Sequence, residues 1–125
     1  MRDRGWGRVV HINGEDGWLG GYSRIPHSVG KGGLRTLTKS LASGLGQYGI
    51  TVNDVSPGFM ETLRDPETHP EVTPERTAEF LPVIPIRRQP TPEELAWARV
   101  FLCSTRSAAI TGAVIHVNGG QWMFG

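Results

Sequence analysis

The chain has 125 residues, of which 38% are hydrophobic and 20% are charged, and its formal net charge is +1. This composition excludes a strongly disordered chain, and the near-neutral charge gives no electrostatic basis for a nucleic-acid partner. The length predicts a single domain over residues 1–125 with a modest core. No stretch approaches the roughly 18 apolar residues that span a bilayer, and the charged start is not a signal peptide. We therefore expect a soluble, cytoplasmic protein without a membrane partner.

The cysteine and histidine content predicts neither a disulfide nor a metal site. Cys103 is the only cysteine, so no internal disulfide can form. Its place beside Phe101 and Leu102 in an expected helix predicts a buried, inert thiol. The four histidines are spread along the chain without a His-x-x-x-His spacing, so we expect no zinc ligands among them.

The first expected elements are a strand, a loop and a long helix. A β-rich run over residues 7–13 predicts a buried strand, and the glycine-rich residues 14–23 predict a loop. The helix should begin near Pro26, which suits a first turn, and end before Gly49, a natural C-cap. Its apolar residues recur at spacings of three and four, which indicates one buried stripe. That stripe comprises Leu34, Leu37, Leu41, Leu45 and Tyr48.

The remaining sequence predicts two more strands and two more helices. Residues 50–55 form the second expected strand, and a short helix is expected over residues 73–80 within a proline-rich loop. A Thr-Pro-Glu-Glu run, typical of a capping box, opens the helix expected over residues 91–104. Residues 113–117 form the third strand. The order strand–helix–strand–helix–strand implies a parallel sheet with right-handed crossovers.

Four blocks of sequence carry a resemblance to a known family. They are Gly7–Gly14, His27–Lys31, Gly49–Thr62 and Ile110–Gly120. In this order and spacing, the blocks resemble the second half of a short-chain dehydrogenase/reductase. The resemblance implies an α/β fold, an incomplete Rossmann-like (doubly wound) parallel sheet of about three strands with flanking helices. The family's N-terminal half, with the glycine-rich turn that binds the cofactor pyrophosphate, has no counterpart here.

The resemblance also implies a site in which two of three catalytic positions are changed. Gly14 stands where the family has its catalytic Ser, His27 where it has its Tyr, and Lys31 matches its Lys. In the family, Ser and Tyr hydrogen-bond the substrate oxygen, Tyr donates the proton, and Lys binds the nicotinamide ribose. The implied cofactor is NAD or NADP, although the missing turn argues against binding. The implied cofactor-binding positions are Lys31, Asn53, Pro57, Gly58, Phe59 and Thr62.

Three functions remain open from these residues. The first is a catalytically impaired relative of the family with a structural or assembly role, which is favoured because the family's Ser, Tyr and phosphate-binding turn are all missing. The second is a residual NAD(P)-dependent oxidoreductase that uses His27 and Lys31. The third is a repurposed hydrolase or lyase, in which Glu15 or Asp16 would orient His27 as a base. Its candidate nucleophiles are Tyr22, Ser23 and Ser28, without a nucleophile-elbow motif to support them.

The resemblance further predicts an oligomer. Without the family's neighbouring strand, the strand over residues 7–13 would become an exposed apolar edge that templates pairing with another chain. The helix over residues 26–48 would also lose a neighbouring helix. We therefore expect a homo-oligomer, a dimer or tetramer, or pairing with a chain that supplies the missing half. The sequence leaves open whether the half-length chain is natural or a fragment.

Overall fold

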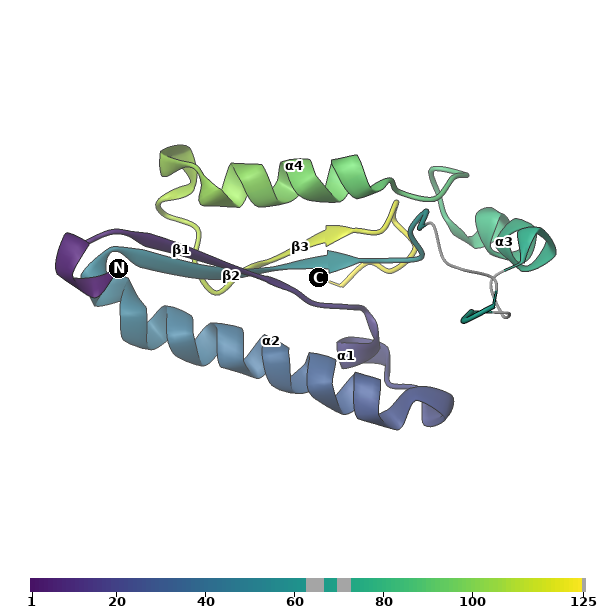
Figure 1. Ribbon diagram of the computed structural model, residues 1–125, viewed down its shortest axis with the longest axis horizontal. Coiled ribbons are helices and arrows are strands. Elements are labelled where there is room, and N and C mark those ends of the chain that lie inside the picture. The colour runs from purple at the N-terminus through teal and green to yellow at the C-terminus, as the bar shows by residue number, and fades with distance from the viewer. Residues whose placement is uncertain (63–66, 70–72, 125) are drawn as a thin grey trace.

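The computed structural model describes residues 1–62, 67–69 and 73–124. Its three strands are β1 (Gly7–Ile12), β2 (Ile50–Pro57) and β3 (Val114–Val117), in the spatial order β1-β2-β3. Both strand pairs are parallel, with Val9 opposite Val52 in the first pair. Two helices cover the sheet, α2 (Ile25–Leu45) on one face and α4 (Pro92–Cys103) on the other (Figure 1). The predicted Rossmann-like α/β fold with three parallel strands is confirmed.

Helix α2 follows its predicted limits closely. Pro26 lies in its first turn, and a 3-10 turn over residues 46–48 leads to Gly49, which adopts the left-handed conformation with φ of 69°. Only part of the predicted apolar stripe is covered, because Leu37 is 47% exposed. The residues that pack against the buried core of Ala42, Ile50 and Val52 are Val9, Leu41, Leu45 and Tyr48.

Helix α4 begins with the predicted capping box. The Thr91 hydroxyl accepts the backbone N–H of Glu94 at 3.3 Å, and the Glu94 carboxylate accepts that of Thr91 at 2.9 Å. The prediction of a buried thiol was wrong, because Cys103 is exposed whereas its neighbour Leu102 is fully buried. Consecutive helical residues point about 100° apart, so only one of this pair can face the sheet.

The other short elements include one confirmation and one correction. Helix α3 (Pro74–Phe80) lies where a short helix over residues 73–80 was predicted, and Thr73 caps its first turn. The expected loop over residues 14–23 instead contains helix α1 (Asp16–Leu19) and a 3-10 turn over residues 22–24. Helix α1 approaches α2 closely because Gly17 has no side chain, and a Cβ there would lie 2.8 Å from the carbonyl carbon of Lys31.

Strand β1 lies at an edge of the sheet, where β2 is its partner within the described residues. Gly7 is buried, but the other β1 residues are half-buried, so the expectation of a buried strand was wrong. An edge strand lacks the neighbour that would cover its outer side, and this explains the partial exposure. Among the described residues, no helix is both long and apolar enough to cross a membrane.

Candidate functional site at the carboxyl ends of the strands

The three predicted catalytic positions converge just beyond the carboxyl end of β1. A Cβ built on Gly14 would lie 3.5 Å from the Lys31 Cε and 3.7 Å from the His27 Nε2. The Lys31 ammonium donates a hydrogen bond of 2.8 Å to the carbonyl of Ile12, the last residue of β1. The fold therefore brings together a glycine, an imidazole and an ammonium in one small space.

The imidazole of His27 is paired with one of the two acids that the sequence offered. Its Nε2 lies 3.5 Å from the Asp16 Oδ2, and the ring is 52% exposed. Asp16 also binds the Arg24 guanidinium at 3.2 Å. The nitrogen that faces Asp16 is the same one that lies nearest position 14, so the carboxylate competes for it with any substrate oxygen bound there.

Glu15 does not pair with His27, and it is not a solvated acid. It is only 6% exposed, and its Oε1 accepts hydrogen bonds from His116 Nδ1 at 3.1 Å and Asn118 Nδ2 at 3.0 Å. Its Oε2 is buried without a hydrogen-bond partner. Reasoning from sequence missed this cluster because its members are 101 and 103 residues apart, and no local pattern links them.

A second buried polar cluster supports the backbone of the site. Asp54 is fully buried, and its carboxylate accepts hydrogen bonds from Asn13 Nδ2 at 2.7 Å and from the Thr38 hydroxyl at 2.5 Å. The His11 Nδ1 lies 2.7 Å from that hydroxyl oxygen. Asn13 in turn accepts the backbone N–H of Gly14 at 3.0 Å. Asp54 therefore holds position 14 through Asn13, a link that the sequence did not reveal.

The expected cofactor-binding positions divide into two groups. Asn53 lies in the middle of β2, where its amide donates to the Ile110 carbonyl at 2.8 Å and accepts the Ala113 N–H at 3.0 Å. This side chain therefore joins β2 to the segment before β3.

The second group follows the carboxyl end of β2. The N–H of Gly58 binds the Val117 carbonyl at 3.2 Å, and a Cβ on Gly58 would lie 2.6 Å from that of Asn118. The Phe59 ring packs on that of Phe80 at 4.7 Å. Pro57 is the last residue of β2. Thr62 interacts with another group of the protein, so it is not without a partner.

Metal ligands are not clustered in the part of the chain that the structure describes. No three His, Cys, Asp or Glu side chains there are grouped so that they could hold an ion. The candidate site consists of Gly14, which has no side chain, Lys31, the pair of the half-exposed His27 with the largely covered Asp16, and the pair of the buried Glu15 with the half-buried His116.

The fold and these positions define an incomplete Rossmann-like α/β domain, and its relatives show which family it belongs to. A family model described as enoyl-(acyl carrier protein) reductase matches residues 1–121. The 3-oxoacyl-[acyl-carrier-protein] reductase of Aquifex aeolicus is 40% identical over 117 residues, which cover 94% of this chain and 46% of that protein. The acetoacetyl-CoA reductase of Rhizobium meliloti is 41% identical over 122 residues, covering 98% and 49%.

Solved structures agree with these matches. A structure from Beutenbergia cavernae, described as an NAD(P) dependent gluconate 5-dehydrogenase with bound NADP at low occupancy, superposes with a TM-score of 0.87 and 32% identity. The match covers 97% of this chain and 48% of that one. The chain belongs to the short-chain dehydrogenase/reductase family, and it spans about half the length of these relatives.

Proposed function

We propose that this chain is a catalytically impaired member of its family that functions through assembly into an oligomer. The observation that carries the proposal is the geometry around Gly14. A side chain at this position would stand 3.5 Å from Lys31 and 3.7 Å from His27, so the catalytic arrangement is assembled around a residue with no side chain. The fold brings Lys31 and His27 close to position 14, but Gly14 has no hydroxyl that could bind a substrate oxygen.

Carbonyl reduction requires hydrogen-bond donors where negative charge develops on the substrate oxygen. Gly14 offers no donor from a side chain. The nearest ring nitrogen of His27 faces Asp16 at 3.5 Å, and a carboxylate beside that oxygen would oppose the developing charge. Both replaced positions thus weaken the electrostatic stabilisation on which reduction depends.

Cofactor binding is proposed to be weak for a related reason. NAD or NADP would be held from its nicotinamide side, by Lys31 and the loop from Pro57 to Thr62. The amide nitrogen and oxygen of Asn53 already form hydrogen bonds within the fold, so this residue would contribute little. The 125 residues contain no glycine-rich turn of the kind that binds the pyrophosphate in the family. When bound, the nicotinamide would supply or accept a hydride. This chain's residues fit only that end of the cofactor.

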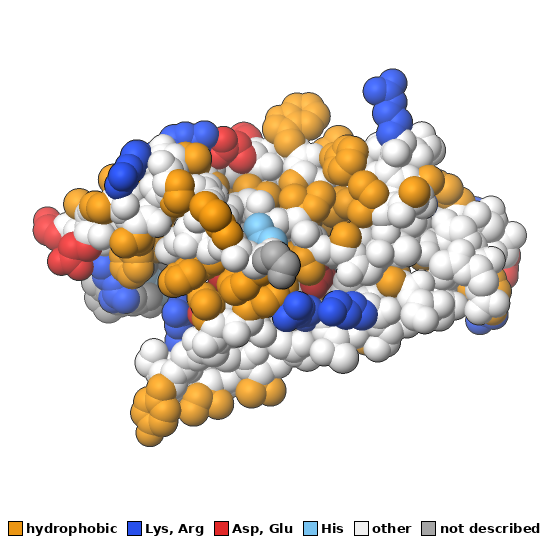
Figure 2. Space-filling view, turned by 180° about the vertical axis from the view of Figure 1, so that it is seen from behind, with side chains coloured by type: hydrophobic (Ala, Val, Ile, Leu, Met, Phe, Trp, Pro, Cys, Tyr) orange, Lys and Arg blue, Asp and Glu red, His pale blue; other side chains and the backbone are white. Residues whose placement is uncertain are grey.

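Assembly is supported by the uncovered surface. Strand β1 has an unpaired edge within the described residues, and three large apolar residues of α4 are about half exposed or more. Figure 2 shows hydrophobic side chains gathered around α4 and across the middle of one face. The exposed α4 residues are Trp97, Val100 and Phe101. A second copy, forming a dimer or tetramer, or a chain supplying the other half of the fold would cover them.

A second candidate function rests on the His27–Asp16 pair. A carboxylate 3.5 Å from an imidazole is an arrangement that can orient a general base, so residual oxidoreductase activity or hydrolysis could use His27. The His27 ring is half exposed and could reach a substrate, and activity that survives in His27→Ala would overturn this alternative.

The test combines light scattering with titration by NADH and NADPH, followed by nicotinamide fluorescence. We expect an oligomer, no saturation up to about millimolar cofactor, and no oxidation of NADPH with acetoacetyl-CoA. Lys31→Ala is the variant, and Lys39→Ala, an exposed lysine of the same helix, is its matched control. Saturable binding lost only in Lys31→Ala would refute impairment, and a compact monomer would refute assembly.

A further inference from the structure

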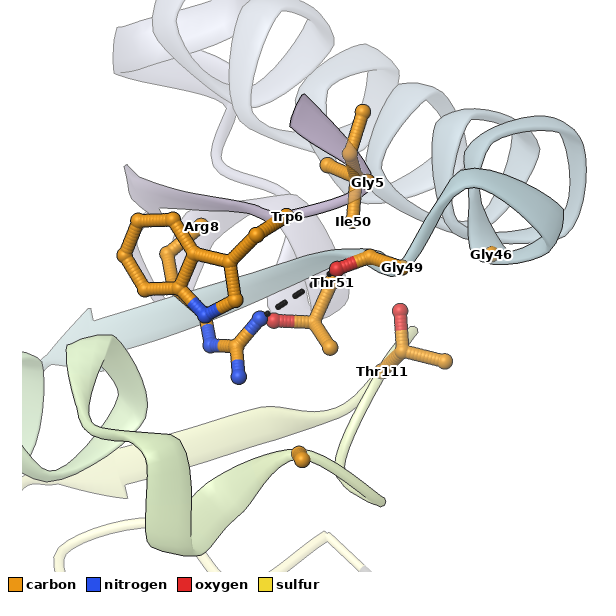
Figure 3. A pocket seen from close by; sticks show the side chains of 9 residues that line it. Gly5, Trp6, Arg8, Gly46, Gly49, Ile50, Thr51 and Thr111 are labelled. Atoms are coloured by element: carbon orange, nitrogen blue, oxygen red, sulfur yellow. Dashed lines mark hydrogen bonds between the residues drawn. The ribbon is translucent and has the colours of Figure 1, made fainter. Parts of the chain in front are cut away.

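We propose that the end of the sheet opposite Gly14 carries a binding site for a small organic anion. A hollow of about 330 Å³ opens at the amino ends of β1 and β2, where Gly7 pairs with Ile50 (Figure 3). Strand β1 has six residues, so this hollow lies roughly 20 Å from the Gly14 site. The proposal is therefore independent of the proposed function.

Two glycine turns meet at the hollow and put no side chains into it. Gly5 and Gly49 both adopt left-handed conformations, with φ of 62° and 69°, and a Cβ on Gly49 would collide with the carbonyl oxygen of Gly5. Gly46 lines the same space and contributes no side chain either. Trp6, which is 46% exposed, forms an aromatic wall. These turns leave room for a ligand beside a flat apolar surface.

Arg8 supplies the charge. It is the one charged residue among the nine described residues that line the hollow. Its guanidinium lies 5.0 Å from the centre of the Trp6 ring, and three of its five N–H donors bind the carbonyls of Gly7, Gly49 and Ser104. These bonds hold the group in place and leave both protons on Nη2 uncommitted. A positioned cation with free donors is a typical partner for a carboxylate or phosphate oxygen.

Two hydroxyl groups complete the site. The Thr51 Oγ1 is buried and has no hydrogen-bond partner. The Thr111 Oγ1 accepts the N–H of Val52 at 3.0 Å, which leaves its own proton free to donate. Both residues line the hollow with Arg8. A buried hydroxyl without a partner is unfavourable, so an acceptor atom entering here would satisfy it.

The donors and the shape together select the ligand class. A cation and two hydroxyl donors recognise an anionic head group, and a volume of about 330 Å³ is at the lower end of the range of small-molecule sites. The Trp6 ring favours a flat apolar body. Arg2 and Arg4 precede the hollow in the chain, and Asp3 is the only acidic residue before Glu15, so the local field also attracts anions. The expected ligand is a small aromatic carboxylate or phosphate.

The test is calorimetric titration of the whole chain with sodium benzoate, phenyl phosphate and the neutral analogue benzyl alcohol. We expect saturable binding of an anion below about 10 mM, at least about tenfold tighter than benzyl alcohol. The stronger of benzoate and phenyl phosphate identifies the head group. Equal binding of benzyl alcohol, or no saturation by either anion, would overturn the proposal.

Two variants test the donors. Arg8→Gln should weaken anion binding by about tenfold or more. Because Arg8 also binds three carbonyls and its loss can perturb folding, Thr51→Val is the second variant. It removes an unpartnered hydroxyl, so the melting temperature should not fall while affinity drops about threefold to tenfold. Lys39→Gln removes an exposed charge elsewhere and should bind as the unaltered chain does. Unchanged affinity in a folded Thr51→Val variant would refute the site.

Discussion

The buried cluster around Asp54 predicts a large cost for Thr38→Val. Thr38 is 1% exposed, and its hydroxyl donates to Asp54 at 2.5 Å and accepts from the His11 Nδ1 at 2.7 Å. Removing a hydrogen bond to a charged group costs about 1.5–3 kcal/mol, and leaving a buried acceptor unpaired adds to this. Valine fills nearly the same volume but cannot replace the hydroxyl. We therefore expect the free energy of unfolding to fall by roughly 2–4 kcal/mol.

The chain offers a matched control for this change. Thr36 lies on the same helix two residues away, is exposed, and its hydroxyl binds only the carbonyl of Gly32, at 3.3 Å. Thr36→Val should change stability by about 0.5 kcal/mol or less. In urea unfolding at one protein concentration, a slope of about 1.5 kcal/mol/M would place the Thr38→Val midpoint roughly 1–3 M lower. Equal midpoints for the two variants would show that the Asp54 cluster contributes nothing to stability.

Three further predictions follow from the helices. Leu41→Ala should cost about 2 kcal/mol, the lower end of the usual range because Leu41 is half-buried, whereas Lys39→Ala should have little effect in the same melts. Hydrogen bonds from Arg88 lower the pKa of Glu94 to about 2, below its ordinary value of 4.5. Their contribution to the stability of the folded state is therefore complete above about pH 4.5 and is lost as the pH falls towards 2. The unfolding midpoint should therefore fall over that interval, and Glu94→Gln should remove this part of the dependence; an unchanged pH profile in Glu94→Gln would contradict it. Cys103 lies three residues from Val100 on α4, so in the proposed oligomer it should react with a thiol reagent more slowly than in the unfolded chain, and reaction at the rate of the unfolded chain would show that no interface covers this part of α4.

Local sequence signals predicted the limits of the helices well. Pro26, Gly49 and Thr91 each act through the backbone of their own turn, so their effect is visible within a few residues of sequence. The family resemblance implied that Gly14, His27 and Lys31 lie together, and the end of β1 and the first turns of α2 bring all three close to one another. Features set by neighbouring residues could therefore be predicted.

Features that depend on distant residues could not. The pairing of Glu15 with His116 links residues near opposite ends of the chain, and no local sequence pattern around either residue predicts it. The exposure of Cys103 depends on which side of α4 faces the sheet. Apolar residues lie on both sides of this helix, so the sequence did not show which side is buried. Asp54 lies in β2, and its polar partners are Asn13, which follows β1, and Thr38 on α2. The main feature that the sequence could not predict was therefore which polar groups are buried.

The Asp54 cluster also specifies how β1 aligns with β2. His11 lies opposite Asp54 in the observed register, and Asn13 reaches the same carboxylate. A slip of one residue would move every β1 side chain to the other face and leave a buried carboxylate without these donors. Apolar side chains alone would tolerate several alignments at an open edge. A polar cluster of this kind makes one alignment far more favourable than its neighbours, so a strand paired on one side only can still have a unique position.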